Sequence, residues 1–509
     1  MSKVVPGFLA QAAAVAVLLQ ACDDTRVPTQ SSGLRMLMAS VGALQATSRH
    51  IVVFAAERIP SDFAGRISTL GGSVEASLDN IGTATVVGLT DAASAQLAAD
   101  PRIQHIEPDL ALTAAQVGAT DADDGAAEET NSLAVAHASA SPTAAQFYAR
   151  QWNLRAVFAD QAWAAGRFGS RDVVIAFLDS GIDYTLPDFD GLVDLARSRS
   201  FVPEDEPIIA NLFPGRLPIS DLHGHGTAVA SVAASNGKVV AGINRDVTVI
   251  AVKILNRLAV GSVAHFVSGL VYAADQGADV INMSGGGTFD RRQNPGAVTA
   301  IKRAVNYASR KGAVLVAPAW NEAADLDQNG DLVVLPCEAP HVICASATGP
   351  TAAAGVNGPW ADVDAFVTSY SNYGRSAIDV AAPGGAGTFA NVDPVSSGTQ
   401  FRRIWVPCTT TPTEASYPAC RRGQPITQPF GTSFSAPHVS GLAALLVAEL
   451  GHGHRGRIRA RILYTADDLG APGKDPYYGW GRINIARALR LLGERDRHDD
   501  ADDDAGRKN

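Results

Sequence analysis

Positive charge is scarce in this sequence, and the apolar stretch near its start is short. The 41 Lys and Arg residues are outnumbered by 51 Asp and Glu, which leaves a net charge of −10. A nucleic-acid-binding surface would be basic, so nucleic acid is not an expected partner. Residues 8–21 are apolar except for Gln11 and Gln20, and they fall short of the about 20 apolar residues that a membrane-spanning helix needs. With 46% hydrophobic residues, the chain can still bury a large core.

Residues 1–22 have the pattern of an export signal. Lys3 supplies a positive start, the apolar stretch follows, and the segment ends in Leu-Gln-Ala-Cys at 19–22, which resembles a bacterial lipoprotein cleavage site. Cys22 is therefore a candidate for lipidation, which would attach the protein to a membrane. The alternative is a cleaved secretory signal with an incidental Cys22. Both predict an exported protein, either secreted or a periplasmic or cell-surface lipoprotein.

Cysteine is rare, and the number is odd. Setting Cys22 aside leaves four of the five cysteines, which fall into two sequence-local pairs. We predict disulfides between Cys337 and Cys344 and between Cys408 and Cys420, although four cysteines allow three connectivities. Free buried thiols are the alternative, and export makes them less favourable.

Composition divides the chain into segments. Residues 23–47 have no clear pattern and are interpreted as a tether, and 48–113 alternate strand-like and helix-like runs, which predicts a small α+β domain. Residues 114–147 are rich in Ala, Asp, Thr and Ser and are interpreted as a linker exposed to cleavage. Residues 148–493 are globular in composition. The charged stretch 494–509 is interpreted as a solvated disordered tail.

The large globular region alternates short apolar runs with helix-length segments. Continuous apolar runs with little alternation are typical of parallel strands covered on both faces. The region is therefore predicted to be an α/β fold with a doubly wound, mostly parallel sheet, whose ligand sites lie beyond the carboxyl ends of the strands. The predicted strands are 173–178, 247–254, 279–283, 313–317, 341–345 and 378–381, and the helices include 264–276, 296–310 and 435–450.

Four polar residues lie at predicted strand ends or helix starts. Asp179 follows the first apolar strand, His225 opens the motif His-Gly-Thr, Asn321 follows the strand 313–317, and Ser433 lies in Gly-Thr-Ser-Phe-Ser at 431–435. An acid, a base, an oxyanion donor and a hydroxyl nucleophile are the components of acyl transfer. Together these motifs resemble those of the subtilisin-like serine proteases, and the resemblance covers roughly residues 148 to 490.

The resemblance implies a role for each of the four residues. It implies a subtilisin-like serine endopeptidase in which Ser433 attacks, His225 is the base, Asp179 orients His225, and Asn321 helps to hold the oxyanion. It also implies that 48–113 are an inhibitory propeptide, which the enzyme removes from itself. Protein or peptide substrates and the propeptide are the expected partners, and no cofactor is required for the chemistry.

Substrate contacts follow from the same resemblance. The segment Ser284, Gly285 and Gly286 matches the lining of the primary specificity pocket, and Ala259, Val260 and Gly261 match a strand that pairs with the substrate backbone. The two glycines leave room, so we expect a broad preference for larger apolar residues; a plain Gly-rich turn is the alternative. Trp320 departs from the family, which has Gly before this Asn, and it is expected to reshape the oxyanion site or the pocket if a positive φ is needed there.

An acidic loop is a weak candidate for structural calcium. Its alternating oxygen side chains resemble a calcium loop, but Pro336 stands at the position where an EF-hand needs Glu. A solvated acidic turn is the alternative reading. The candidate ligands are Asp325, Asp327, Asn329 and Asp331.

Two other functions are alternatives to a protease. A binding protein on a decayed protease fold is suggested by the unusual Trp320. A lipid or ester hydrolase is disfavoured, because the Ser433 motif is not Gly-x-Ser-x-Gly and the order Asp, His, Ser differs from that fold.

Overall fold

The continuous apolar runs form one parallel sheet in the computed structural model, which describes residues 46–115, 141–387 and 399–491. Seven strands lie in the order β16, β13, β11, β9, β5, β7, β6, and every neighbouring pair is parallel. All six predicted strands are confirmed within a few residues at either end. The strands are β5 (Gly169–Asp179), β6 (Arg199–Ser200), β7 (Asp246–Lys253), β9 (Val280–Met283), β11 (Val314–Pro318), β13 (Val342–Thr348) and β16 (Val380–Pro383).

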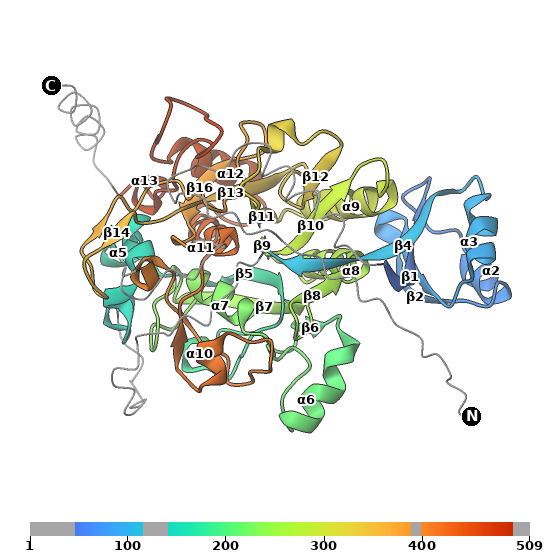
Figure 1. Ribbon diagram of the computed structural model, residues 1–509, viewed down its shortest axis with the longest axis horizontal. Coiled ribbons are helices and arrows are strands. Elements are labelled where there is room, and N and C mark those ends of the chain that lie inside the picture. The colour runs from blue at the N-terminus through green and yellow to red at the C-terminus, as the bar shows by residue number, and fades with distance from the viewer. Residues whose placement is uncertain (1–45, 116–140, 388–398, 492–509) are drawn as a thin grey trace, which may run out of the picture.

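Helices cover both faces of this sheet, as the apolar pattern of the central strand requires. Alternate residues of β5 belong to two different cores: Val173, Ile175 and Phe177 pack on the side of α7 and α11, and the residues between them pack on the side of α8 and α9. The three predicted helices are confirmed as α8, α9 and α11. Although α11 is long and apolar enough to cross a membrane, it is mostly buried inside the protein as a core helix (Figure 1).

The remaining helices surround this centre. The helices of the large unit are α4 (Trp152–Ala156), α5 (Ala159–Ala164), α6 (Glu206–Leu212), α7 (His225–Ala233), α8 (Val263–Asp275), α9 (Pro295–Arg310), α10 (Pro418–Arg421), α11 (Thr432–Leu450), α12 (Arg455–Tyr464) and α13 (Ile485–Ala488). Its short outer strands are β8 (Val260–Ser262), β10 (Gly285–Asp290), β12 (Leu332–Leu335), β14 (Ala352–Ala353), β15 (Trp360–Ala361), β17 (Val406–Pro407) and β18 (Ile426–Thr427).

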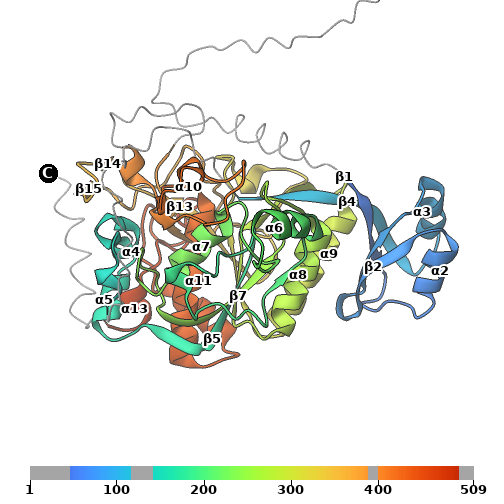
Figure 2. The same cartoon turned by 90° about the horizontal axis from the view of Figure 1, so that it is seen from below.

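A second, antiparallel sheet joins a small α+β unit to the large one. The small unit lies at one end of the molecule and contributes four strands and two helices (Figures 1 and 2). Its last strand, β4, pairs with β1 inside the small unit and then with β8 and β10 of the large unit. The elements are β1 (Ala46–Phe54), α2 (Phe63–Thr69), β2 (Ser73–Leu78), β3 (Thr83–Val87), α3 (Asp91–Ala98) and β4 (Ile103–Ala114).

Several segment boundaries differ from those expected from composition. The residues Ala114 and Ala115 continue β4 into the large unit instead of beginning a linker. Strand β1 begins at Ala46, inside the expected tether. The export signal with Cys22 and the charged tail 494–509 lie outside the described residues.

Both predicted disulfides are present. Cys337 and Cys344 are bonded with their Cα atoms 4.9 Å apart, and Cys408 and Cys420 are bonded at 5.0 Å. The first links the segment after β12 to β13, and the second closes the loop that carries α10. The prediction of two sequence-local pairs is therefore confirmed.

Candidate active site

A carboxylate and an imidazole meet at the carboxyl end of the parallel sheet. Asp179 is the last residue of β5 and His225 the first residue of α7, and both are fully buried. His225 Nδ1 donates a hydrogen bond of 2.7 Å to Asp179 Oδ1. This contact fixes the ring and the tautomer. His225 Nε2 is buried and has no hydrogen-bond partner in the described parts of the chain, so it is free to accept a proton.

A serine hydroxyl lies at the start of the helix that packs on α7. Ser433 is the second residue of α11, and its Oγ is buried with no partner in 46–115, 141–387 or 399–491. The ring of Phe434, the next residue, lies 6.0 Å from the His225 ring, centroid to centroid. Because the first N–H groups of a helix lack intrahelical partners, this position also offers backbone donors.

Asn321 bridges the helix start and the end of β4. Its Oδ1 accepts hydrogen bonds from Thr432 N at 2.9 Å and Thr432 Oγ1 at 3.0 Å, which aims the amide nitrogen away from α11. That nitrogen, Nδ2, donates to the carbonyl oxygen of Ala115 at 2.9 Å. The preceding Trp320 has φ +74°, the left-handed region, which costs a non-glycine residue about 1–2 kcal/mol.

The end of β4 lies between two strands of the large unit. Ala115 N donates to the Ser284 carbonyl at 2.9 Å, and Ala114 N donates to the Ala259 carbonyl at 3.0 Å. In register, Ala114 lies opposite Gly285, Thr113 opposite both Gly286 and Val260, and Leu112 opposite Gly261. Every residue predicted to bind substrate thus pairs with this one segment, so the plain Gly-rich turn does not describe 284–286.

Two carboxylates of β4 extend this contact to the neighbouring helices. Glu107 accepts hydrogen bonds from Gly296 N at 2.6 Å and Ala297 N at 3.2 Å, at the start of α9. Asp109 accepts one from Ala264 N at 3.0 Å, at the start of α8. A carboxylate at a helix N-terminus stabilises by roughly 0.3–1 kcal/mol, and by up to about 2 kcal/mol where it is partly buried.

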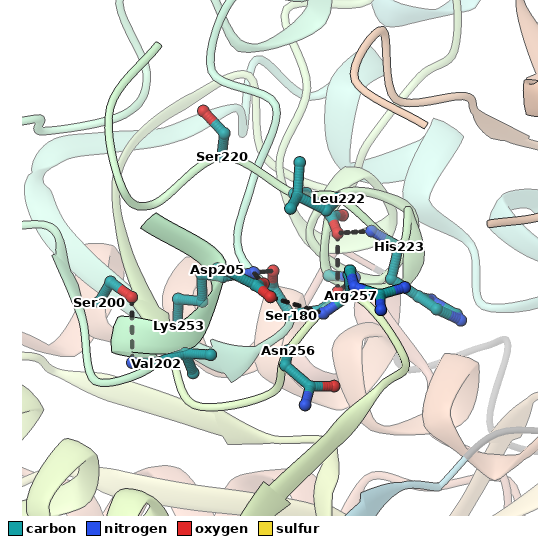
Figure 3. A network of polar contacts seen from close by, with 12 residues as sticks. Ser180, Ser200, Val202, Asp205, Ser220, Leu222, His223, Lys253, Asn256 and Arg257 are labelled. Carbon is teal, nitrogen blue, oxygen red and sulfur yellow. Dashed lines mark hydrogen bonds and ion pairs between the residues drawn. The ribbon is translucent and has the colours of Figure 1, made fainter. Parts of the chain in front are cut away.

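A buried cation supports the turn that follows Asp179. Lys253, the last residue of β7, is fully buried and donates to the Ser180 carbonyl at 2.6 Å. Its Nζ also pairs with Asp205 Oδ2 at 2.9 Å, and Asp205 Oδ1 accepts from Arg257 N at 3.3 Å (Figure 3). Ser180 N in turn donates to Asp179 Oδ1 at 2.7 Å. This pair was not predicted from the sequence, although a lysine at the end of an apolar strand was a signal for it.

A second buried carboxylate connects the same turn to α7. Asp221 Oδ1 accepts from Ser180 Oγ at 2.9 Å, and Asp221 Oδ2 accepts from Thr227 N at 2.8 Å and Thr227 Oγ1 at 2.6 Å. Ser180 Oγ also accepts from Gly226 N at 2.9 Å. The elements that carry Asp179 and His225 are therefore held together by contacts besides their own hydrogen bond.

Two of the other polar residues near the site, His438 and Asp183, have structural partners, and two nearby histidines have lowered pKa values. His438 Nδ1 donates to the Phe434 carbonyl at 2.7 Å and Nε2 accepts from Asn153 at 2.9 Å, and burial lowers the pKa of His438 to about 4. Burial, together with the charge of the adjacent His225, lowers the pKa of His223 to about 4. Asp183 accepts hydrogen bonds from Thr410 and pairs with Arg216 at 2.8 Å.

The four calcium candidates do not converge. Asp325 caps the turn at 326–328, Asp327 accepts hydrogen bonds from Arg375 and Ser376, Asn329 donates to Glu338, and Asp331 pairs with Arg292. Across the described segments, no group of three or more His, Cys, Asp or Glu side chains could hold a metal ion. The loop is held by these protein contacts.

The fold and the site together define an α/β enzyme with a carboxylate–imidazole pair beside a helix-borne serine. The model of the subtilase family matches residues 170–481, and the chain belongs to this family and is a serine endopeptidase. It is 32% identical over 359 residues to the thermophilic serine proteinase of Bacillus sp. (strain AK1), covering 68% of this chain and 69% of the relative. It is 31% identical over 354 residues to thermitase of Thermoactinomyces vulgaris, covering 69% and 99%.

Solved structures share the same fold. The epidermin leader peptide processing serine protease of Staphylococcus aureus superimposes with a TM-score of 0.66 at 19% identity, covering 88% of this chain and 99% of that chain. At this identity the similarity concerns the fold alone. The expected subtilisin-like fold is thereby confirmed.

Proposed function

We propose that this chain is an exported zymogen of a serine endopeptidase that cuts its own chain between Ala115 and Gln116. Residues 46–115 are the inhibitory propeptide, and the large unit is the catalytic domain. The observation that carries the proposal is the hydrogen bond of 2.9 Å from Asn321 Nδ2 to the Ala115 carbonyl oxygen. In acyl transfer, the carbonyl oxygen of the attacked bond lies beside such an amide donor. The donor stabilises the negative charge that forms on this oxygen.

Each polar residue of the site has one role in the proposed reaction. His225 Nε2 takes the proton of Ser433 Oγ as this oxygen attacks the carbonyl carbon of Ala115, and Asp179 stabilises the imidazolium. Asn321 Nδ2 and a backbone N–H at the start of α11 hold the oxyanion. When the intermediate collapses, the bond between the Ala115 carbonyl carbon and the Gln116 nitrogen breaks, and His225 gives its proton to that nitrogen. Ala115 is then esterified to Ser433. Water then hydrolyses the ester.

The product of this cut would remain bound as an inhibitor. After cleavage, β4 keeps its main-chain pairing with β8 and β10 and its two carboxylates at the starts of α8 and α9. Peptide substrates would then use the same two strands, since strand addition binds main chain and leaves selectivity to a few side-chain positions. Full activity therefore requires loss of the propeptide.

Export is supported by the sequence of residues 1–22 and by the two disulfides, which are typical of proteins that leave the reducing cytosol. Acylation of Cys22 and the resulting membrane attachment remain predictions. Mass spectrometry of the uncleaved Ser433→Ala precursor purified from its host tests the acylation, because Cys22 precedes the proposed cut and an acylated N-terminus at Cys22 differs in mass from an unmodified one.

The processing proposal is tested with a matched pair of serine variants. Ser433→Ala should accumulate as an uncleaved precursor, whereas the wild-type mature chain should begin at Gln116. Ser435→Ala is the control, because its hydroxyl lies in the same helix and is equally buried without a partner in the described chain. Ser435→Ala should be processed normally. Cleavage of the Ser433→Ala precursor at the same bond in a protease-free preparation would refute self-processing.

A fluorophosphonate probe distinguishes an active protease from a binding protein that has lost catalytic activity. The mature wild type should be labelled at Ser433, and the label should disappear in Ser433→Ala. An unlabelled but correctly folded wild type would favour the binding protein instead.

A further inference from the structure

Trp320 occupies an unusual place between β11 and the amide that holds the Ala115 carbonyl. It is buried, with 4% of its surface exposed, and its backbone has φ +74°. Its own carbonyl accepts from Asn372 N at 3.1 Å, and the preceding Ala319 N donates to the Ala345 carbonyl at 2.9 Å. The surrounding backbone therefore holds Trp320 in this conformation, and the direction of its side chain is fixed.

The indole lies beside β10, on one particular face. A Cβ built on Gly286 would lie 2.9 Å from Trp320 Cη2, and it would also meet the Leu335 carbonyl and the Pro336 ring. Gly286 pairs with Thr113 in antiparallel register, and paired residues project to the same face. The indole tip thus lies on the face toward which Thr113 projects.

Ala115 lies at a bend one residue beyond β4 and two residues after Thr113, the spacing at which strand residues share a face. Its N–H continues the ladder to Ser284, and its side chain is buried, with a relative exposure of 1%. The side chain that precedes the cleaved bond therefore points into space that Trp320, together with the segment after β12, already fills.

Selectivity for an apolar side chain lies at another position. Leu112 and Ala114 project to the opposite face, and Leu112 is fully buried. It pairs with Gly261, where an added Cβ would lie 3.0 Å from Leu255 Cδ2. A large apolar residue is thus accommodated three residues before the one whose carbonyl is attacked.

We propose that Trp320 closes the primary specificity pocket, so that this enzyme cleaves after residues no larger than about alanine. The inference rests on the proposed function, because it takes Ala115 as the residue before the cut. It also reverses the preference for larger apolar residues that Gly285 and Gly286 suggested in the sequence.

The test compares two peptides that differ at one side chain. The mature enzyme is assayed with Leu-Thr-Ala-Ala-p-nitroanilide and Leu-Thr-Ala-Phe-p-nitroanilide, and the ratio of their kcat/KM values is independent of the fraction of active enzyme. We expect the wild type to favour Ala by at least about tenfold, since a filled pocket must be displaced to admit a benzyl group. Trp320→Gly should reverse the ratio toward Phe, and glycine tolerates φ +74°.

Trp405→Phe is the matched control, since Trp405 is a fully buried tryptophan in a different core cluster. It should keep the wild-type ratio. A wild type that prefers Phe, or a Trp320→Gly enzyme that keeps the wild-type ratio, would overturn the inference. If Trp320→Gly does not fold, the test uses the wild-type ratio and the ratio of Trp320→Phe. The smaller ring in that variant opens part of the pocket, so its ratio should shift toward the Phe peptide. Failure of the wild type to hydrolyse either peptide would instead contradict the proposed peptidase site.

Discussion

The buried pair of Lys253 and Asp205 offers a sharp test of how the turn after Asp179 is supported. Both side chains are removed from solvent, with exposures of 0% and 1%, and their charged atoms lie 2.9 Å apart. Asp205→Asn preserves the shape of the side chain but removes its charge. Lys253 would then carry an uncompensated charge inside the protein, which is costly because the interior solvates it poorly.

The expected loss in the free energy of unfolding depends on whether one partner of the buried ion pair is removed or both are replaced. Removing one partner should lower the free energy of unfolding by about 3–5 kcal/mol. Replacing both, in Lys253→Met with Asp205→Leu, removes both charges and leaves mainly the Ser180 carbonyl without its donor, which costs about 1–3 kcal/mol. The double variant should therefore be more stable than either single variant.

The assay is equilibrium unfolding by urea in a Ser433→Ala background, which prevents self-digestion. Lys253→Met, Asp205→Leu, their combination and Asp205→Asn are compared with the parent, and the double-mutant cycle gives the coupling energy. We expect a coupling of at least about 3 kcal/mol. Single variants that lose less than about 1 kcal/mol, or a double variant that loses the sum of the singles, would refute the reasoning.

Three further predictions concern the oxyanion donor, the propeptide and a disulfide. Asn321→Ala should slow self-processing by about 10²–10³-fold, the loss known for such a donor in the relative subtilisin, with a gel time course as the measurement. Burial, reinforced by Arg49 of β1, lowers the pKa of His265 to about 4 from 6.5, while Glu75 opposes this. Because Arg49 belongs to the segment proposed as propeptide, its release should raise the pKa of His265, so the cleaved segment should bind more weakly at pH 5 than above pH 7, and His265→Gln should reduce that difference in inhibition titrations. Replacing Cys408 and Cys420 by Ser should lower the free energy of unfolding by about 3 kcal/mol through the 12-residue loop they close, and unchanged urea unfolding would contradict this.

Local patterns predicted the architecture well because parallel strands leave a strong signal. The run 173–178 is apolar on every residue, and the structure explains this by placing its alternate side chains in two cores. The motifs around His225 and Ser433 also predicted two helix starts correctly. Each motif combines a polar side chain with the small residues that allow a helix to pack closely on a sheet. The two short disulfide loops were predicted as the pairing of sequence neighbours, one of the three connectivities that four cysteines allow.

Contacts between distant segments could not be read in this way. Asn321 and Ala115 are 206 residues apart, and Glu107 and Gly296 are 189 apart. No local pattern marks Ala115 as a continuation of the β4 ladder, since it lies at the start of a stretch of small and polar residues. The same holds for Asp205 and Lys253, whose pairing depends on how the turn at Pro203–Asp205 packs against the end of β7.

The sequence by itself therefore determined the family, the fold class and the identity of the four polar residues at the strand ends and helix starts, because these depend on periodicity and on short motifs. It also marked Trp320 as unusual. Only the tertiary structure decided where that indole lies, which main-chain carbonyl the Asn321 amide contacts, and which buried charges hold the turn after Asp179. These depend on side-chain directions and on pairings across the whole chain, and sequence periodicity does not encode them.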